Sequence, residues 1–250
     1  MSEAIGLIIG SGFAWLAAGQ RGRRRIDTPY GESSSELIDL ELGGQGVTCL
    51  IRHGEAHRIA PHEVNYRANV WAMHAAGLRA LVAVNVVGAI APGFLPGQLA
   101  LPDQIIDYTH GRVSSYGPDE QGVRHIDFTE PFDAVLRGRL AAAAQAAGLG
   151  FANGVYGVTQ GPRLETAAEI DRLERDGCTM VGMTAMPEAA LACELELPYA
   201  IVAVAVNHAA GRSPAGATIH AELERYLGEG MQRAAALIEQ LLRAASSATM

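Results

Sequence analysis

The sequence predicts a single α/β domain over residues 1–250, with a mixed, mostly parallel central sheet flanked by helices. Short apolar runs typical of buried parallel strands alternate with alanine-rich segments of helical periodicity. Hydrophobic residues make up 49% of the 250 residues, which is enough to bury a large core. No internal repeat, low-complexity tract or linker divides the chain, so we expect one domain.

The strands are predicted from the apolar runs and the helices from the alanine-rich periodic segments between them. In chain order, we expect strands at residues 4–9, 37–42, 47–52, 80–86, 98–107, 154–160, 180–183 and 199–206. We expect helices at residues 65–76, 133–147, 166–176, 187–195 and 221–245. Gly77, Gly148 and Gly177 each follow a predicted helix, where glycine commonly ends one. The stretch 108–131 is too long for a simple connector, which makes it a candidate lid or subunit-contact loop.

The charge and the cysteines limit the class of protein. A net charge of -8 and a pI near 5.5 argue against binding to a nucleic-acid backbone. The basic run at residues 21–25 is interpreted as a solvated loop. Cys49, Cys178 and Cys193 lack metal-type spacing and suit the core of a cytoplasmic protein.

Neither targeting nor membrane insertion is expected. The apolar stretch at residues 5–9 is far shorter than a signal-peptide core and has no basic flank before it. The longer apolar stretch at residues 80–101 contains Asn85, Pro92, Pro96 and Gln98, which would leave a broken, polar helix in lipid. We therefore expect a soluble protein.

A glycine loop, Gly10-Ser11-Gly12, directly follows the first predicted strand. Its backbone N–H groups and the Ser11 hydroxyl suit an anion. The loop begins like a dinucleotide-binding fingerprint, but Trp15 stands where the third glycine belongs, so this interpretation is weak. An anion site and a plain tight turn both stay open.

Arg52 and His53 follow another strand, and they suit a phosphate. The guanidinium offers a forked pair of donors and the imidazole offers a third. His53 and His57, four residues apart, also invite a zinc site. Because the chain has no HExxH pattern and no nearby cysteine or carboxylate triad, we expect no metal.

Two later turns also follow strands, at Asn85-Val86 and at Met183-Thr184. Ligands in open α/β sheets collect at the carboxyl ends of strands. Thr184 can offer a hydroxyl to an anion, and Met183 an apolar face to a sugar. Taken singly, Met183 also suits a core position and Thr184 a helix N-cap.

Glu165 follows the Gly161-Pro162 turn, and Asn207 ends the apolar run at residues 200–206. Each therefore places a polar side chain, a carboxylate or an amide, where regular structure is interrupted. A 6-oxopurine shows an acceptor at O6 and a hydrogen on N1, so a carboxylate facing N1 and an amide facing O6 or N7 complement its edge. Two structural roles compete with this hypothesis: Glu165 can complement a helix dipole, and Asn207 can be a turn residue after a strand.

These motifs, taken together and in order, resemble methylthioadenosine phosphorylase and its relatives among the trimeric purine nucleoside phosphorylases. The resemblance runs over residues 5–242. It is carried by Arg52-His53-Gly54, Val64-Asn65-Tyr66-Arg67-Ala68-Asn69, Pro96-Gly97, His125-Ile126, Glu130-Pro131-Phe132, Gly161-Pro162-Arg163, Met183-Thr184 and Met186-Pro187-Glu188.

The resemblance implies the nucleoside phosphorylase fold and a reaction in which inorganic phosphate attacks the anomeric carbon of a nucleoside. It implies that phosphate is held by Ser11, Arg52, His53, Asn85, Val86 and Thr184. Met183 would support the ribose, and His125 would reach a neighbouring subunit's site in a homotrimer. It implies no metal or organic cofactor, with phosphate as a co-substrate, and catalysis through anion positioning and stabilisation of charge on the departing base.

The chain departs from the methylthioadenosine-specific pattern, which has serine at Glu165 and aspartates at Asn207 and Ala209. Glu165 opposite the N1 of adenine would place two acceptors face to face, at a cost of about 1 to 3 kcal/mol. We therefore expect Glu165 and Asn207, with His53, to be the catalytic residues acting on a 6-oxopurine. The neighbours Leu164, His208 and Ala209 are expected to bind substrate.

The 5′ end of the sugar leaves two alternatives. If Ile219 lines the pocket, the site is apolar and suits a methylthio group; if His220 does, ordinary inosine becomes plausible. The rest of the chain favours the first, so we expect S-methyl-5′-thioinosine to be converted to hypoxanthine and 5-(methylthio)ribose 1-phosphate. A methylthioadenosine phosphorylase, a general 6-oxopurine nucleoside phosphorylase and a nucleoside-binding protein without turnover are the alternatives.

Overall fold

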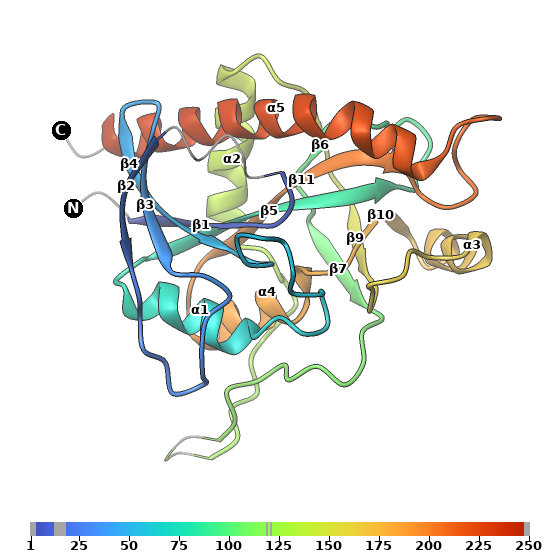
Figure 1. Cartoon of the computed structure of the whole chain (residues 1–250). Helices are drawn as coiled ribbons and strands as arrows, with labels where there is room; N and C mark the ends of the chain where they lie inside the picture. The colour runs from blue at the N-terminus through green and yellow to red at the C-terminus, as the bar shows by residue number, and fades with distance from the viewer. Residues whose placement is uncertain (1–3, 13–18, 119, 121, 248–250) are drawn as a thin grey trace.

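The computed structural model describes residues 4–12, 19–118, 120 and 122–247. Figure 1 shows a central twisted sheet with helices on both faces. The strands are β1 (Ile5–Ile9), β2 (Gln20–Arg24), β3 (Leu37–Leu42), β4 (Gln45–Ile51), β5 (Ala80–Ala89), β6 (Leu99–Ala100), β7 (Gln104–Asp107), β8 (Phe151–Ala152), β9 (Val155–Val158), β10 (Cys178–Gly182) and β11 (Tyr199–His208). The helices are α1 (Tyr66–Ala75), α2 (Ala134–Ala146), α3 (Ala167–Arg175), α4 (Ala185–Glu194) and α5 (Ile219–Ser247).

The sheet is mixed and mostly parallel, as the sequence predicts. Its main path runs β2-β3-β4-β1-β5-β10-β9-β7, and β11 pairs with β5 and β6 while β8 pairs with β6. Parallel pairs include β1 with β4 and β5, and β11 with β5. The buried strands β1, β5 and β11 are apolar along nearly their whole length because helices cover both of their faces.

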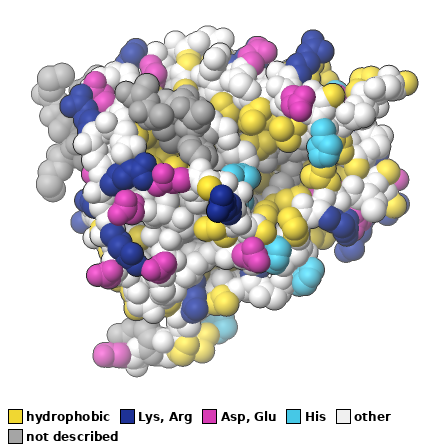
Figure 2. Space-filling view, in the orientation of Figure 1, with side chains coloured by type: hydrophobic (Ala, Val, Ile, Leu, Met, Phe, Trp, Pro, Cys, Tyr) yellow, Lys and Arg dark blue, Asp and Glu magenta, His cyan; other side chains and the backbone are white. Residues whose placement is uncertain are grey.

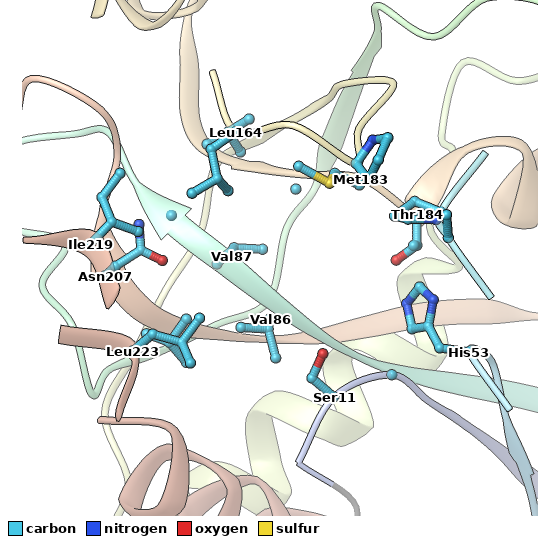
Figure 3. A pocket seen from close by; sticks show the side chains of 18 of the residues that line it. Ser11, His53, Val86, Val87, Leu164, Met183, Thr184, Asn207, Ile219 and Leu223 are labelled. Carbon is cyan, nitrogen blue, oxygen red and sulfur yellow. The ribbon is translucent and has the colours of Figure 1, made fainter. Parts of the chain in front are cut away.

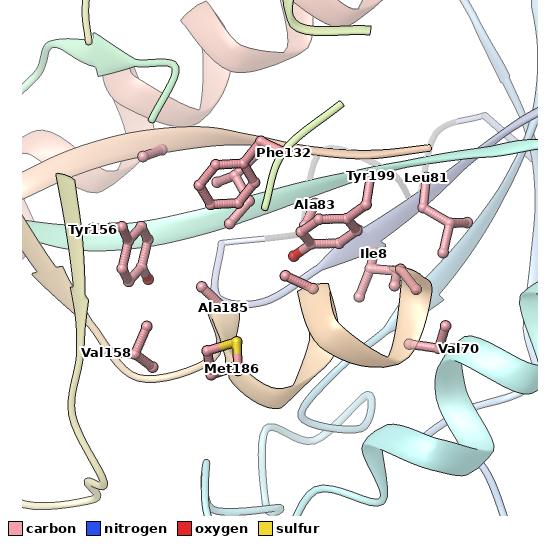
Figure 4. Close-up of a cluster of buried hydrophobic side chains, with 14 of the residues drawn as sticks. Ile8, Val70, Leu81, Ala83, Phe132, Tyr156, Val158, Ala185, Met186 and Tyr199 are labelled. Carbon is pink, nitrogen blue, oxygen red and sulfur yellow. The ribbon is translucent and has the colours of Figure 1, made fainter. Parts of the chain in front are cut away.

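Two buried clusters hold the helices against the sheet. The helices α2 and α5 pack on one face and α1 and α4 on the other, as Figure 1 shows. In the cluster on the side of α1 and α4, drawn in Figure 4, the rings of Phe132 and Tyr199 stack with their centroids 6.2 Å apart. Tyr199 also donates to Glu188 Oε1 of α4 at 2.8 Å, which ties the start of β11 to α4.

The long strand β5 creates the space for a ligand. On one of its edges, β1 pairs with residues Ala80 to Val84, and antiparallel β10 pairs with Gly88 and Ala89. Neither strand pairs with residues 85–87 on that edge, so the sheet opens there. This is the point in an open α/β sheet at which ligands bind, because strands on either side diverge.

Two predictions about the elements are wrong. The basic run is a strand, β2, rather than a solvated loop; it pairs with β3 at the sheet edge, where charges keep an edge strand from pairing further. The arginines of β2 contact Glu41, Glu55 and Asp39, and Arg25, just after the strand, contacts Glu32. The single strand expected at residues 98–107 is two short strands separated by Pro102, which cannot donate to a sheet ladder.

The stretch 108–131 is irregular in the residues described, as expected, and extends away from the body below the sheet in Figure 1. Its role as a lid or subunit contact stays a prediction. In the part of the chain that the structure describes, no helix is long and apolar enough to cross a membrane. Trp15, which interrupts the dinucleotide fingerprint, lies outside the described residues.

Candidate active site

A cavity of about 440 Å³ lies at the opening beside β5. Residues far apart in the sequence line it, because it collects the ends of β1, β4, β5, β10 and β11 and the start of α5. In the space-filling view of Figure 2, hydrophobic side chains gather around a hollow on the right half of this face. The lining includes Ser11, Arg52, His53, Val86, Leu164, Glu165, Met183, Thr184, Asn207, Ala209 and Ile219, all predicted from the sequence.

Figure 3 shows that polar and apolar side chains occupy different ends of this cavity. Ser11, His53 and Thr184 lie together at one end, near the carboxyl ends of β1 and β4 and the start of α4. Leu164, Asn207, Ile219 and Leu223 lie at the other end, with Met183 along the wall between. We call these the anion end and the base-and-sugar end.

Arg52 is held at the anion end by a buried ion pair. Its Nε donates to Glu188 Oε2 and its Nη2 to Glu188 Oε1, both at 2.8 Å, and the two side chains are 1% and 0% exposed. Nη2 also donates to Asn85 Oδ1 at 2.9 Å. A buried guanidinium needs such a partner, since an uncompensated charge would be very costly there. The Glu188 carboxylate raises the pKa of Arg52 against the opposing effect of burial.

The geometry changes the role that the sequence suggested for Arg52. The forked donors point at Glu188 rather than at a ligand, and Nη1 is the nitrogen left for an anion. A Cβ atom at Gly10 would lie 3.0 Å from Nη1, a tight contact, so glycine lets the loop after β1 lie close to the guanidinium. The glycine loop and Arg52 therefore face the same small space.

His53 lies at this end as a neutral imidazole. Its Nδ1 is 2.8 Å from the Ile59 carbonyl oxygen, which can only accept, so Nδ1 carries the hydrogen. Burial, and secondarily the charge of Arg52, lower the pKa of His53 from 6.5 to about 4. At neutral pH, Nε2 is therefore an acceptor, not the third donor expected from the sequence, and it suits a phosphate oxygen that bears a proton.

Thr184 offers its hydroxyl to the cavity although it occupies the N-cap position of α4. Its side chain makes no capping hydrogen bond, and its Oγ1 accepts from Asn85 Nδ2 at 3.3 Å. The role of a simple helix cap is therefore wrong for this side chain. Asn85 itself lies behind the cavity wall, where it links Arg52 to Thr184, while the next residue, Val86, lines the cavity.

Glu165 and Asn207 lie in the same cavity, as the base-edge hypothesis requires. Thr159 Oγ1 donates to Glu165 Oε1 at 2.5 Å, which orients the carboxylate. The helix α3 does not depend on Glu165, because Thr166 and Glu169 form its capping box. Glu165 is thus available to a ligand.

Asn207 is 8% exposed and stands near the end of β11, just after a bulge in its pairing with β5. Its Nδ2 donates to the His208 carbonyl oxygen at 2.7 Å, which uses one amide hydrogen, and Figure 3 shows the amide oxygen pointing toward the cavity. The sequence led us to expect a donor here. The structure instead presents an acceptor, because a backbone carbonyl takes the amide hydrogen.

Ile219, at the start of α5, lines the cavity, whereas His220 is exposed and lies outside its lining. Leu223, one helical turn later, lines it too, so this wall is apolar. Of the two alternatives for the sugar's 5′ end, the structure places the apolar side chain in the cavity.

Two expected substrate-binding residues lie outside the cavity. His208 pairs with Glu222, with Nδ1 and Oε1 2.8 Å apart, and its backbone N–H donates to Glu222 Oε2 at 2.9 Å. This pair joins the end of β11 to α5. His125 is exposed on the irregular stretch and lines a separate cavity with Glu130 and Cys193.

Comparison with known proteins decides the family. The model of the phosphorylase superfamily matches residues 4–243. The chain belongs to the phosphorylase superfamily. A relative from Pseudomonas syringae pv. tomato, named a probable S-methyl-5′-thioinosine phosphorylase, is 51% identical over 88% of this chain and 89% of its own.

Two further phosphorylases are similar over most of their length. The 6-oxopurine nucleoside phosphorylase of Pyrococcus furiosus is 41% identical over 84% of this chain and 81% of its own. The structure of methylthioadenosine phosphorylase from Schistosoma mansoni with adenine has a TM-score of 0.89 at 28% identity, covering 98% of this chain and 92% of the other. The predicted phosphorylase fold is confirmed.

Sequence reasoning missed two residues of this phosphorylase site. One is Glu188, which is fully buried in the first turn of α4; a carboxylate among the apolar residues of this helix start is the signal that indicates a buried cation as its partner. The other is Leu223, which could have been predicted from its spacing, because it lies four residues after Ile219 on the same helix face. Within the ranges described, no group of three or more His, Cys, Asp or Glu side chains could hold a metal ion.

Proposed function

We propose that this phosphorylase cleaves S-methyl-5′-thioinosine with inorganic phosphate, giving hypoxanthine and 5-(methylthio)ribose 1-phosphate. The observation that carries the proposal is one cavity with an anion end, a base-facing Glu165 and Asn207, and an apolar wall from Ile219 and Leu223. The 51% identical relative named for this reaction supports it. No metal or organic cofactor is needed for such a displacement.

Phosphate would occupy the anion end. Arg52 Nη1, the Ser11 and Thr184 hydroxyls and the Val86 backbone N–H are the donors, and neutral His53 accepts from a protonated phosphate oxygen. Arg52 is fixed before the reaction by its ion pair with Glu188, and His53 by its contact with the Ile59 carbonyl oxygen, so these two side chains lose little freedom on binding. A bound phosphate oxygen then attacks the anomeric carbon as the bond from that carbon to the purine N9 breaks.

The base would be read by Glu165 and Asn207. The Glu165 carboxylate accepts the N1 hydrogen of a 6-oxopurine, a contact that a 6-aminopurine cannot make because its N1 is itself an acceptor. The electron pair of the broken bond moves into the purine, and the base is neutralised when N7 takes a proton from water. Asn207 Oδ1 can accept a hydrogen bond from that N7–H, which stabilises the departing base.

The sugar would lie along Met183 with its 5′ group against the apolar wall. Leu164, Ile219 and Leu223 offer carbon surface there, which suits a methylthio group. A 5′-hydroxyl would lose water without gaining a partner from these side chains. This observation favours a methylthio substrate over inosine or guanosine.

We also propose that three copies assemble and that His125 of one copy completes the site of its neighbour. Its exposed place on the irregular stretch, outside this chain's own cavity, supports the proposal, as do the exposed apolar side chains Val113, Val123 and Val135. Light scattering would give the mass of the assembly; a monomer that is fully active would contradict the shared site. The three free cysteines fit a cytoplasmic location.

One comparison tests the reaction class. The protein is incubated with and without phosphate on methylthioinosine, methylthioadenosine, inosine and adenosine, and free base is measured. We expect release only with phosphate, fastest from methylthioinosine. Release without phosphate would mean a hydrolase, and binding without release would mean a nucleoside-binding protein.

A further inference from the structure

Arg112 lies on the irregular stretch 108–131 and does not line the cavity, yet its guanidinium contacts two loops that do. We infer that Arg112 is a positioning residue of the active site: it holds the loop that carries Glu165 at a fixed place relative to the turn that carries Met183 and Thr184. The inference rests on the proposed function, because it assigns those loops to the base and to the sugar and phosphate.

The first set of contacts is with the base-facing loop. Arg112 Nη2 donates to the Gln160 carbonyl oxygen at 2.8 Å, and Nε donates to Gln160 Oε1 at 3.2 Å. The adjacent residue, Thr159, holds the Glu165 carboxylate through its hydroxyl at 2.5 Å. A shift of Gln160 would therefore move the support on which the orientation of Glu165 depends.

The second set of contacts is with the turn between β10 and α4. Arg112 Nη1 donates to the Met183 carbonyl oxygen at 2.7 Å and to the Met186 carbonyl oxygen at 2.6 Å. Met183 and Thr184 line the cavity from this turn. One planar group thus fixes the separation of two backbone segments that β9 and β10 deliver side by side.

A third contact leads to the segment after β4. The Arg112 guanidinium carbon lies 5.6 Å from the centroid of the Tyr66 ring, and Tyr66 donates to the Pro61 carbonyl oxygen at 2.8 Å. Pro61 lines the cavity. Together, these contacts connect three cavity-lining segments through the side chain of Arg112.

The chemistry of the contacts requires arginine. The hydrogen bonds of Arg112 in the described structure go mainly to backbone carbonyl oxygens and none goes to a carboxylate, so a surface ion pair does not explain its place. Its donors lie in one plane and point in fixed directions, whereas a lysine ammonium is a point charge that cannot span both loops. The expected consequence of its loss is a mispositioned Glu165, with lower turnover and weaker discrimination between bases.

The test uses Arg112→Ala and Arg112→Lys beside Arg137→Gln as the matched control. Arg137 also donates to a backbone carbonyl, that of Leu101, but lies on α2 away from the cavity. For each variant, kcat/KM is measured for methylthioinosine and methylthioadenosine, with thermal unfolding as a check on folding. Arg112→Ala is also assayed with guanidinium chloride below its denaturing range, against sodium chloride at the same ionic strength.

We expect Arg112→Ala to lose about 100-fold in kcat/KM for methylthioinosine, the order that a misplacement of about 1 Å produces. Its preference over methylthioadenosine should shrink, and free guanidinium should restore part of the activity. A folded Arg112→Ala with wild-type selectivity, or a loss that guanidinium does not restore, would overturn the inference.

If Arg112→Ala does not fold, the Arg112→Lys variant decides the inference: a narrowed selectivity supports it and an unchanged one overturns it. If the wild-type protein itself shows no preference for methylthioinosine, the proposed substrate is wrong. The positioning role is then decided by whether guanidinium restores turnover of whichever nucleoside is the better substrate.

Discussion

Replacing Glu188 by glutamine isolates the part that the buried ion pair plays at the anion end. The carboxylate accepts three hydrogen bonds, from Arg52 Nε, from Arg52 Nη2 and from the Tyr199 hydroxyl, each at 2.8 Å. Glutamine has nearly the same shape but offers one oxygen and no charge. Wherever its NH₂ group lies, it faces a donor of Arg52 or Tyr199.

The size of the effect follows from the burial of the pair. Arg52 and Glu188 are 1% and 0% exposed, so solvent cannot replace the lost charge. Leaving a buried guanidinium without its counter-ion costs about 3 to 5 kcal/mol. Tyr199→Phe is the matched control, because it removes one of the three hydrogen bonds and keeps the ion pair, at a cost of about 1.5 kcal/mol.

The assay compares urea unfolding and steady-state kinetics at equal protein concentration. We expect Glu188→Gln to be less stable by about 3 kcal/mol or more. We also expect its KM for phosphate to rise about tenfold while its KM for nucleoside changes little, since Arg52 Nη1 is displaced. A variant within about 1 kcal/mol of wild type, with an unchanged KM for phosphate, would refute the reasoning.

Three further predictions concern single positions. The pKa of His53 falls from 6.5 to about 4 on folding, so between these pH values the unfolded chain binds a proton that the native protein does not. The free energy of unfolding should therefore fall by about 3 kcal/mol as the pH drops from 6.5 to 4. Urea unfolding across this range should show that His53→Gln loses this part of the pH dependence. Ile219→Ser should lower kcat/KM for methylthioinosine about tenfold relative to inosine, and an unchanged ratio would show that the 5′ group lies elsewhere. Glu222→Gln removes the charged partner of His208 at the start of α5, so the KM for nucleoside should rise while the KM for phosphate stays the same; equal changes in both would mean general loss of structure.

Much of the fold was predictable because the buried strands are nearly uninterrupted apolar runs. The strand expected at residues 37–42 has those bounds, and the helix expected at 166–176 differs from α3 by one residue at each end. The strand β2 was missed because its edge position lets charged side chains replace the apolar pattern. Local pattern thus predicts an element where burial determines its composition.

The lining of the cavity was also largely predictable, because residues at the carboxyl ends of parallel strands meet at one edge. What the sequence could not give is which atom of each side chain faces the ligand. The partner of Arg52 lies 136 residues away, and it turns the forked donors away from the anion. In the same way, the hydrogen bond from the Asn207 side-chain amide to the His208 carbonyl oxygen reverses which end of the amide faces the cavity.

The most direct test of the proposed function is the ratio of kcat/KM for methylthioinosine to that for methylthioadenosine, measured with saturating phosphate. The ratio isolates the base edge, since the two substrates share their sugar and 5′ group. Glu165 opposite N1 predicts a preference of roughly ten- to hundredfold for methylthioinosine, and Glu165→Ser with Asn207→Asp should reduce it. Equal values for the two nucleosides in the wild-type protein would contradict the proposed recognition of a 6-oxopurine by Glu165.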